Sequence, residues 1–498
     1  MRLTLAEIAG ATGGQILGGD PDVAASSYSI DTRTLAPGAL FVALLAERDG
    51  HAFVADALDR GAAGALVSRV VEGVGLVLVD DTAAALTALG ASARDRLAGV
   101  PVVGITGSTG KTSTKDLTAA ALAPAGPVGA SAVSFNNEIG VPLTLLSAPA
   151  GAVAVVAEMG ARGMGHIATL CAVARPTVGV ITNIGMAHAE FFGSREEVAR
   201  AKGELLEALP AGGHAVLNAD DDMTPGLRSR TAAAVVTAGA SAGADVRVSG
   251  VRLDGDLHPA FRLETPWGSV DVPPLPVRGA HQAGNAALAV AVAGAIGVGL
   301  EAAVGGLAGA VGSPLRMDLR RTPAGLVVLN DSYNANPTSM AAALDALAAL
   351  GGGGGRRYAV LGPMAELGPH AEEEHRRLGR LAAAAGVEAV LAVAVSGPGV
   401  TGGPGGPMSS AMAALADGAR EAGAEAVLVD GPQGALAELA ARLRAGDAVL
   451  VKASRMAGLE RLAAQLLDLP VPRVDDPEPG GRGMSPRQPR REQRGAAR

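Results

Sequence analysis

An apolar run, a glycine turn and a helix start follow one another in Val102-Val103-Gly104-Ile105-Thr106-Gly107-Ser108-Thr109-Gly110-Lys111-Thr112. Glycines in such a turn let backbone N–H groups converge on phosphate oxygens at the N-terminus of the following helix. The Lys111 amine can reach the β and γ phosphates, and the Thr112 hydroxyl can bind Mg²⁺. The stretch therefore predicts ATP binding, although Gly107 and Gly110 are separated by two residues and the standard loop has four.

Lysine is scarce in this chain, and its positions are informative. Of 41 lysines and arginines, only Lys111, Lys115, Lys202 and Lys452 are lysines. A genome with GC-rich codons replaces lysine by arginine wherever a positive charge is enough. A lysine amine can lose its proton, whereas the guanidinium of arginine cannot. The four lysines are therefore candidates for a chemical role, with retention by chance as the alternative.

Composition limits the class of protein. The chain has 498 residues, enough for about three domains of roughly 150 residues each. A net charge of −8 argues against broad nucleic-acid binding. Cys171 is the only cysteine, which favours a reducing compartment without disulfides. Because the N-terminus lacks a signal-like segment and no apolar run approaches the ~20 residues of a membrane span, we expect a cytoplasmic protein without membrane insertion.

Strands and helices alternate along most of the chain, which predicts α/β folding with parallel sheets and helices on both faces. After Pro101, apolar strands are expected at 102–106, 152–157, 177–182 and 214–217. Two loops, 351–355 and 399–407, are too glycine-rich for regular structure. The end is rich in Pro, Gly and Arg and is expected to be disordered. The predicted divisions are 1–98, 99–313, 314–473 and the tail 474–498.

Two further residues are candidate metal ligands. Glu158 ends an apolar strand next to the loop strand, where a carboxylate can hold Mg²⁺ opposite Thr112. The alternative is a solvated glutamate at a strand end. His188 follows the next strand, at the edge where parallel sheets place ligands, although a lone histidine is usually structural.

The short G-x-x-G-K-[ST] loop resembles that of the Mur ligases, and further matches to this family are spread over about residues 25 to 460, including the four stretches that follow. Ser29-Ile30-Asp31-Thr32-Arg33 and Asp49-Gly50-His51-Ala52-Phe53 are similar to the UDP-binding domain of that family. Ser134-Phe135-Asn136-Asn137-Glu138-Ile139-Gly140-Val141-Pro142 is similar to a substrate loop. Asn330-Asp331-Ser332-Tyr333-Asn334-Ala335-Asn336-Pro337 is close to a signature of the members that act on D-alanyl-D-alanine.

The resemblance implies a fold, a reaction and its cofactors. The expected fold is a small N-terminal α/β UDP-binding domain, a central P-loop ATPase domain with a parallel sheet, and a C-terminal Rossmann-like domain. The expected reaction joins D-alanyl-D-alanine to UDP-N-acetylmuramoyl-tripeptide through an acyl phosphate, giving the pentapeptide precursor of peptidoglycan, ADP and phosphate. ATP and Mg²⁺ are the implied cofactors, and a monomer is expected.

The resemblance also assigns residues. Lys202 matches the family's carbamylated lysine: a neutral amine adds CO₂ and becomes an anionic oxygen ligand suited to Mg²⁺. The alternative is an ordinary surface lysine on a helix. The implied catalytic residues are Lys111, Lys202 and His188, and the implied metal ligands are Thr112, Glu158, His188 and Lys202. ATP contacts are expected from Gly107, Ser108, Thr109, Gly110, Lys111, Thr112, Ser113, Asn285, Arg316 and Asp331. Substrate contacts are expected from Ser29, Asp31, Arg33, Asn136, Asn137, Tyr333 and Asn334.

The sequence departs from the family pattern at three places, and two other functions stay open. Gln282 replaces an asparagine, Pro363 an aspartate and Ala453 a glycine. One alternative is another amide ligase of the superfamily, such as a different muropeptide ligase or a folylpolyglutamate synthase. The segment from Asp31 to Phe53 argues against the folate enzyme. The other alternative is a nucleotide-binding regulator that lost catalysis, against which the joint retention of Lys111, Glu158, His188 and Lys202 argues.

Overall fold

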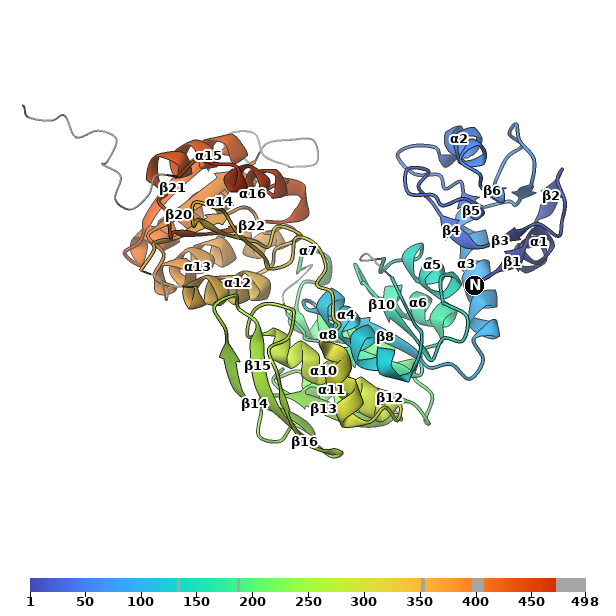
Figure 1. Ribbon diagram of the computed structural model, residues 1–498, viewed down its shortest axis with the longest axis horizontal. Coiled ribbons are helices and arrows are strands. Elements are labelled where there is room, and N and C mark those ends of the chain that lie inside the picture. Colours follow the sequence, from blue (N-terminus) through green and yellow to red (C-terminus); the bar gives the residue numbers. More distant parts are fainter. Residues whose placement is uncertain (132–134, 186–188, 351–353, 396–406, 472–498) are drawn as a thin grey trace, which may run out of the picture.

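The computed structural model describes residues 1–131, 135–185, 189–350, 354–395 and 407–471. Within these residues the strands form four sheets, of five, two, nine and six strands. Figure 1 shows the N-terminal part in blue at one end, the central part in cyan to yellow, and the C-terminal part in orange to red at the other end. Parts of both predicted glycine-rich loops, His188 and the predicted tail lie outside the described residues.

The N-terminal domain is built on the five-stranded sheet, in the order β2-β7-β6-β5-β4. All its pairs are parallel except β2 with β7. Thr4 caps the first helix, since its hydroxyl accepts from Glu7 N and Glu7 Oε2 accepts from Thr4 N. The elements are β1 (Leu3–Thr4), α1 (Leu5–Thr12), β2 (Gln15–Leu17), β3 (Ala24–Ala25), β4 (Ser27–Ser29), β5 (Ala39–Val42), α2 (Val54–Asp59), β6 (Gly64–Val67), β7 (Leu76–Leu78) and α3 (Thr82–Arg96).

The central domain is built on the nine-stranded sheet, in the order β16-β15-β14-β13-β12-β11-β8-β10-β9. The strand of the phosphate loop, β8, lies between β10 and β11 and is parallel to both. Its strands are β8 (Val102–Thr106), β9 (Val128–Ala130), β10 (Ala154–Glu158), β11 (Val178–Ile181), β12 (His214–Asn218), β13 (Ala234–Gly239), β14 (Val246–Leu253), β15 (Pro259–Thr265) and β16 (Gly268–Val272). The four predicted strands are observed as β8, β10, β11 and β12, and they pair in parallel as expected. Strands β9, β13 and β14 extend the parallel part, and β15 and β16 add an antiparallel part; none of these five strands was predicted.

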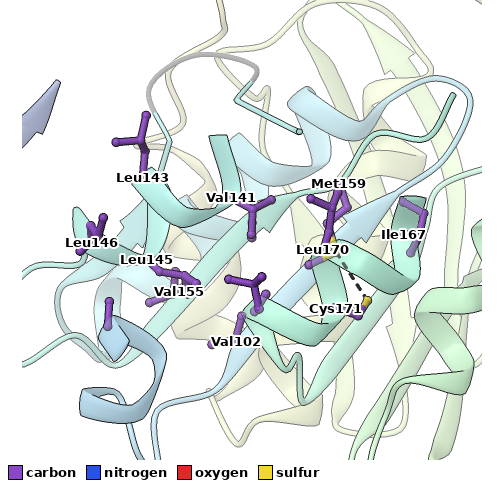
Figure 2. Packing of buried hydrophobic residues seen from close by; sticks show 14 of the residues in the cluster. Val102, Val141, Leu143, Leu145, Leu146, Val155, Met159, Ile167, Leu170 and Cys171 are labelled. Carbon is purple, nitrogen blue, oxygen red and sulfur yellow. Dashed lines mark hydrogen bonds between the residues drawn. The ribbon is translucent and has the colours of Figure 1, made fainter. Parts of the chain in front are cut away.

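Helices cover both faces of this sheet. On one face, α4, α10 and α11 enclose an apolar core. On the other face, α5, α6 and α8 pack with α3 of the N-terminal domain. Figure 2 shows part of that second core, where Cys171 points its sulfur at Met159. Burial raises the pKa of the Cys171 thiol to about 12, which keeps it protonated. The helices are α4 (Lys111–Leu122), α5 (Gly140–Leu146), α6 (His166–Ala174), α7 (Ala189–Phe192), α8 (Arg195–Glu207), α9 (Thr224–Arg228), α10 (Gln282–Ala295) and α11 (Leu300–Leu307).

The C-terminal domain is built on the six-stranded sheet, in the order β17-β18-β22-β19-β20-β21. Only β17 is antiparallel to its neighbour. Its strands are β17 (Asp318–Arg321), β18 (Val327–Asn330), β19 (Arg357–Leu361), β20 (Ala389–Ala394), β21 (Glu425–Asp430) and β22 (Ala448–Lys452). Its helices are α12 (Pro337–Ala349), α13 (Ala371–Ala384) and α14 (Pro407–Glu421) over one core, and α15 (Gly431–Arg442) and α16 (Glu460–Leu467) over the other. No helix among the described residues is long and apolar enough to cross a membrane.

Helices α13 and α14 cross closely where Gly379 of α13 meets Gly418 of α14. The stability of the protein should therefore be sensitive to one added methyl group at this crossing. A Cβ on Gly379 would clash with the backbone of Leu415 and Ala419. We expect Gly379→Ala to lower the free energy of unfolding by about 1–3 kcal/mol through overpacking. Gly305→Ala in α11, where a Cβ would meet no atom within 4 Å, is the control and should cost nothing. Urea unfolding followed by circular dichroism measures both, and equal shifts in the two variants would contradict the packing argument.

Candidate active site

A cavity of about 890 Å³ lies at the carboxyl edge of the central sheet and continues against the C-terminal domain. Its central side contains the phosphate loop and residues that follow β10, β11 and β12, and its far side contains residues 331–339 and 452–456. Open parallel sheets place ligands at this edge. The cavity joins most of the predicted site residues: Ser108, Thr109, Gly110, Lys111, Thr112, Ser113, Asn136, Asn137, Glu158, Asn285, Arg316, Asp331, Tyr333 and Asn334.

The phosphate loop has the predicted turn, and both glycines are required by its shape. Gly107 has φ 149° and Gly110 has φ 77°, in the region that favours glycine. A Cβ on Gly107 would clash with the Thr182 hydroxyl, and one on Gly110 would lie 2.9 Å from Asn285 Oδ1. Because α4 begins at Lys111, its first amide groups have no acceptor within the helix and are available to an anion at the cavity.

Asn183, immediately beyond β11, holds this loop in place. Thr109 N donates to Asn183 Oδ1 at 2.8 Å, and Asn183 Nδ2 donates to Thr109 Oγ1 at 2.6 Å. The backbone of Asn183 also accepts from Ser108 N at 3.0 Å. The sequence analysis missed this residue. Its signal was available, because it is a polar residue directly after an apolar strand that neighbours the loop strand.

Lys111 lies half-buried at the cavity, folded back on its own loop. Its Nζ donates to Gly107 O at 2.8 Å. Burial lowers the pKa of Lys111, the Glu158 carboxylate opposes this, and Arg316 adds to it. The ammonium group of Lys111 is therefore placed where the negative charge of a bound phosphate would neutralise it.

Glu158 connects the nucleotide loop to the predicted substrate loop. It is only 1% exposed, so the alternative of a solvated glutamate is wrong. Thr112 Oγ1 donates to Glu158 Oε2 at 2.8 Å, and Asn136 Nδ2 donates to Glu158 Oε1 at 2.9 Å. Arg316 Nη2 reaches the same Thr112 hydroxyl at 3.0 Å.

The donor set of this pair suits Mg²⁺. A carboxylate and a hydroxyl are hard oxygen donors, and Mg²⁺ in phosphate-transfer sites uses one or two carboxylates together with phosphate oxygens. In the described part of the chain no three His, Cys, Asp or Glu side chains form a metal cluster. Thr112 and Glu158 fit an ion shared with a nucleotide, because they supply a hydroxyl and a carboxylate and the phosphates would supply further oxygens.

Lys202 lies on α8, buried beneath this region. The residue is 1% exposed, so the alternative of a surface lysine is wrong. Burial lowers the pKa of Lys202 well below that of ordinary lysine, and the charge of Lys111 lowers it further. Within the described residues its amine has no hydrogen bond or ion pair. It does not line the cavity, and the predicted partner His188 lies outside the described residues.

The C-terminal domain contributes two pairs of side chains to the cavity wall: an arginine stacked on a tyrosine ring, and a lysine paired with an aspartate. The Arg316 guanidinium lies 4.1 Å from the centre of the Tyr333 ring. Lys452 Nζ binds Asp331 Oδ2 at 2.5 Å and donates to Asn334 O at 2.9 Å. Both members of the pair are buried, so Lys452 fixes the carboxylate of Asp331 at the cavity wall.

At the start of α10, Asn285 lies against the phosphate loop. Thr114 Oγ1 donates to Asn285 Oδ1 at 3.3 Å, and Asn285 Nδ2 donates to Gln282 Oε1 at 2.9 Å. The departure at Gln282 therefore keeps a polar partner for Asn285. Asn137, which also lines the cavity, stabilises the start of α5, because its Oδ1 accepts from Gly140 N at 3.0 Å.

Ser29, Asp31 and Arg33 are not brought to the cavity. They lie in the N-terminal domain, where Arg33 Nη2 pairs with Asp31 Oδ2 at 2.6 Å. Hydrogen bonds from Arg33 lower the pKa of Asp31 to about 2. Besides Asn183, the cavity includes Asn218, the last residue of β12, and Asp220 just beyond it, which the sequence analysis also missed.

Comparisons with known proteins agree over most of the chain. Residues 105–293 match the family described as Mur ligase middle domain, and residues 315–455 match that described as Mur ligase, glutamate ligase domain. UDP-N-acetylmuramoyl-tripeptide–D-alanyl-D-alanine ligase of Mycobacterium tuberculosis is 39% identical over 502 residues, covering 94% of this chain and 98% of the relative. A crystal structure of MurF from Acinetobacter baumannii has TM-score 0.79 at 32% identity, covering 94% of this chain and 99% of that one. MurF ligase from Thermotoga maritima in complex with ADP has TM-score 0.70 at 27% identity, covering 89% and 97%.

Proposed function

Because this chain belongs to the Mur ligase family, we infer that it joins D-alanyl-D-alanine to UDP-N-acetylmuramoyl-tripeptide with conversion of ATP to ADP and phosphate. The chain is an ATP-dependent amide ligase that makes a peptidoglycan precursor. The structural observation that carries the proposal is Glu158, which binds Thr112 of the nucleotide loop with one oxygen and Asn136 of the substrate loop with the other. The nucleotide and the carboxylate of the substrate would thereby be bound next to each other, on either side of Glu158.

The reaction needs an activated carboxylate. An oxygen of the tripeptide's terminal carboxylate attacks the γ-phosphorus, ADP leaves, and an acyl phosphate forms. The free amine of D-alanyl-D-alanine then attacks the acyl carbon, the new amide loses a proton, and phosphate departs with the carboxylate oxygen. Bound Mg²⁺ supplies neutralisation of phosphate charge in this chemistry.

The residues of the loop and of the C-terminal domain divide the work of binding. The α4 amides and Lys111 hold the β and γ phosphates, and Thr112 with Glu158 would hold the metal. Asn285, Arg316 and Asp331 would hold the rest of the nucleotide, in support of which Thr114 and Lys452 already orient two of these side chains. Tyr333 and Asn334 would contact the substrates.

Lys202 is proposed to be carbamylated. Its lowered pKa keeps the amine neutral at pH values where ordinary lysine is protonated. A neutral amine adds CO₂, forms an N–C bond and loses one proton, which gives a carbamate anion. Such an anion beside Lys111 would find a positive neighbour and, with His188, could serve a second Mg²⁺ that screens the carboxylate from the phosphate.

The two substrates would be held by different parts of the chain. Ser29, Asp31 and Arg33 are proposed to hold the UDP group, and their exposure leaves them accessible to it.

The boundaries 1–98, 99–313, 314–473 and 474–498 are proposed as the domain limits. A cytoplasmic monomer is proposed as well, consistent with the need for ATP and with the single, unpaired cysteine.

The test is a ligation assay on the full chain. Phosphate release is measured with ATP, Mg²⁺ and UDP-N-acetylmuramoyl-tripeptide, with and without D-alanyl-D-alanine, and the product is identified by mass. We expect pentapeptide and phosphate only when both substrates are present. Product with another amino-acid acceptor would favour a different amide ligase, and ATP binding without turnover on any acceptor would favour a regulator.

A further inference from the structure

One turn of the central sheet inserts into the C-terminal domain. Strands β14 and β15 belong to the nine-stranded sheet, yet Figure 1 shows their hairpin reaching the C-terminal domain beside α12. Leu257, in the connecting turn, is 1% exposed and belongs to the apolar core under α12, α13 and α14. Every other buried member of that core lies at residue 317 or beyond. Leu257 of the central domain is thus buried in its neighbour's core, and the partly buried Leu253 of β14 packs against the same core.

The turn holds the backbone of Leu257 in a fixed and unfavourable conformation. Asp254 Oδ1 accepts from Asp256 N at 2.9 Å and from His258 N at 2.8 Å. Leu257 has φ 67°, a left-handed conformation that leucine seldom adopts and that glycine or asparagine adopts easily. A leucine at such a position indicates that its side chain is needed, because an easier residue would make the same turn.

The polar contacts that join the Leu257 turn to the C-terminal domain lie at the surface. Arg321 Nη2 pairs with Asp256 Oδ1 at 2.8 Å and donates to Gly255 O at 2.8 Å. Both charged side chains are about half exposed, so this ion pair contributes little. The apolar side chain of Leu257, fully buried where that of Leu253 is only partly so, is therefore the main attachment at this point.

The covalent linker makes the second connection between the two domains. Leu315 has φ 60° and Met317 has φ 50°, and Ser313 Oγ donates to Asp116 Oδ2 of α4 at 2.6 Å. In the described part of the chain five non-glycine residues have positive φ, and Leu257, Leu315 and Met317 are three of them. Strained backbone is concentrated at switch regions. A third contact joins α7 to the C-terminal domain, where Glu190 N donates to Glu366 O at 3.1 Å, and this hydrogen bond would break as the domains separate. The linker and the Leu257 turn would remain as the two points about which the C-terminal domain turns, with the cavity between the two domains.

We propose that Leu257 is the pivot on which the C-terminal domain turns as the cavity closes over its substrates. It is a positioning residue that touches no reactant. A single apolar side chain can rotate in its socket and stay buried, whereas a broad interface would have to break. Its carbonyl also accepts from Gly279 N at 2.9 Å, which keeps the pivot beside the start of α10 at the cavity wall. The inference rests on the proposed function, which requires nucleotide contacts from both domains.

The test compares domain closure in variants of the full chain by small-angle X-ray scattering. The wild type should contract when Mg²⁺, a non-hydrolysable ATP analogue and UDP-N-acetylmuramoyl-tripeptide are added. Leu257→Gly, which relieves the strain but removes the side chain, should fail to contract and should lose about tenfold or more in kcat. Its KM for the UDP substrate should not change. Leu257→Met, which restores an apolar side chain of similar size, and Arg321→Ala should both contract like the wild type.

The outcomes separate the pivot from simple packing and from the proposed function. Leu257→Gly that contracts and turns over normally, even with a lower melting temperature, would show a packing role only and overturn the proposal. If the glycine variant does not fold, Leu257→Ala makes the same comparison. A wild type that does not contract would also overturn the pivot. A wild type that contracts but forms no pentapeptide would overturn the proposed function and leave the pivot supported.

Discussion

Lys202→Ala should lose about a thousandfold or more of kcat while the protein still binds ATP. The side chain is buried and its pKa is lowered, so the wild-type amine is available to CO₂, and alanine cannot form the carbamate that would serve the second ion. A short carboxylate such as acetate should restore part of the activity, because it can occupy the space of the lost carbamate. Initial rates with and without acetate measure both effects.

The matched control is Arg200→Ala, an exposed residue of the same helix, which should keep wild-type activity. The pH dependence provides a second check. As the pH falls, the amine of Lys202 becomes protonated and the carbamate is lost, so activity should decline on the acid side and added bicarbonate should partly restore it. Full activity of Lys202→Ala, or no bicarbonate effect in carbonate-depleted buffer, would contradict carbamylation.

Glu158→Gln should raise the Mg²⁺ concentration needed for half-maximal activity by about 10- to 100-fold and lower kcat by about a hundredfold. Glutamine has nearly the same shape, but it removes the charge that would hold the ion opposite Thr112. It also removes the charge that raises the pKa of Lys111, so Lys111 should lose its proton at a lower pH. The alkaline limit of ATP binding should move down accordingly. Mg²⁺ titrations and ATP binding across pH measure these two effects.

Glu138→Gln is the control for this variant, because Glu138 also lines the cavity but is exposed. It should leave the Mg²⁺ requirement unchanged. The same shift in both variants would mean that the general field of the cavity, rather than a ligand at 158, sets the metal affinity.

The sequence was sufficient for the elements whose local signal is strong. The strand 102–106 is predicted with its observed bounds, since every residue in it is buried and a glycine turn ends it. The strands that flank it are apolar too, apart from Glu158 at the end of β10, so their assignment did not depend on periodicity. The burial of Glu158 and Lys202, in contrast, depends on helices and strands far apart in the sequence. The motif could indicate their chemistry but not their exposure.

Other features had weak local signals. Strands β14 to β16 mix buried residues with partly buried and exposed ones, and they lie at one edge of the sheet, so no apolar run marked them. Leu257 looked like an ordinary turn residue, because only the approach of a second domain makes it part of a core. Asn183 was missed for a different reason: its position after a strand was visible, but its partner in the phosphate loop was not.

The central claim is that this cavity activates a carboxylate as an acyl phosphate. The most direct measurement uses UDP-N-acetylmuramoyl-tripeptide labelled with a heavy oxygen isotope in its terminal carboxylate, followed by mass analysis of the phosphate released with D-alanyl-D-alanine. We expect one labelled oxygen in each phosphate, because the carboxylate oxygen that attacks phosphorus leaves with it. Unlabelled phosphate accompanying pentapeptide would contradict the acyl phosphate and the roles assigned to Lys111 and Glu158.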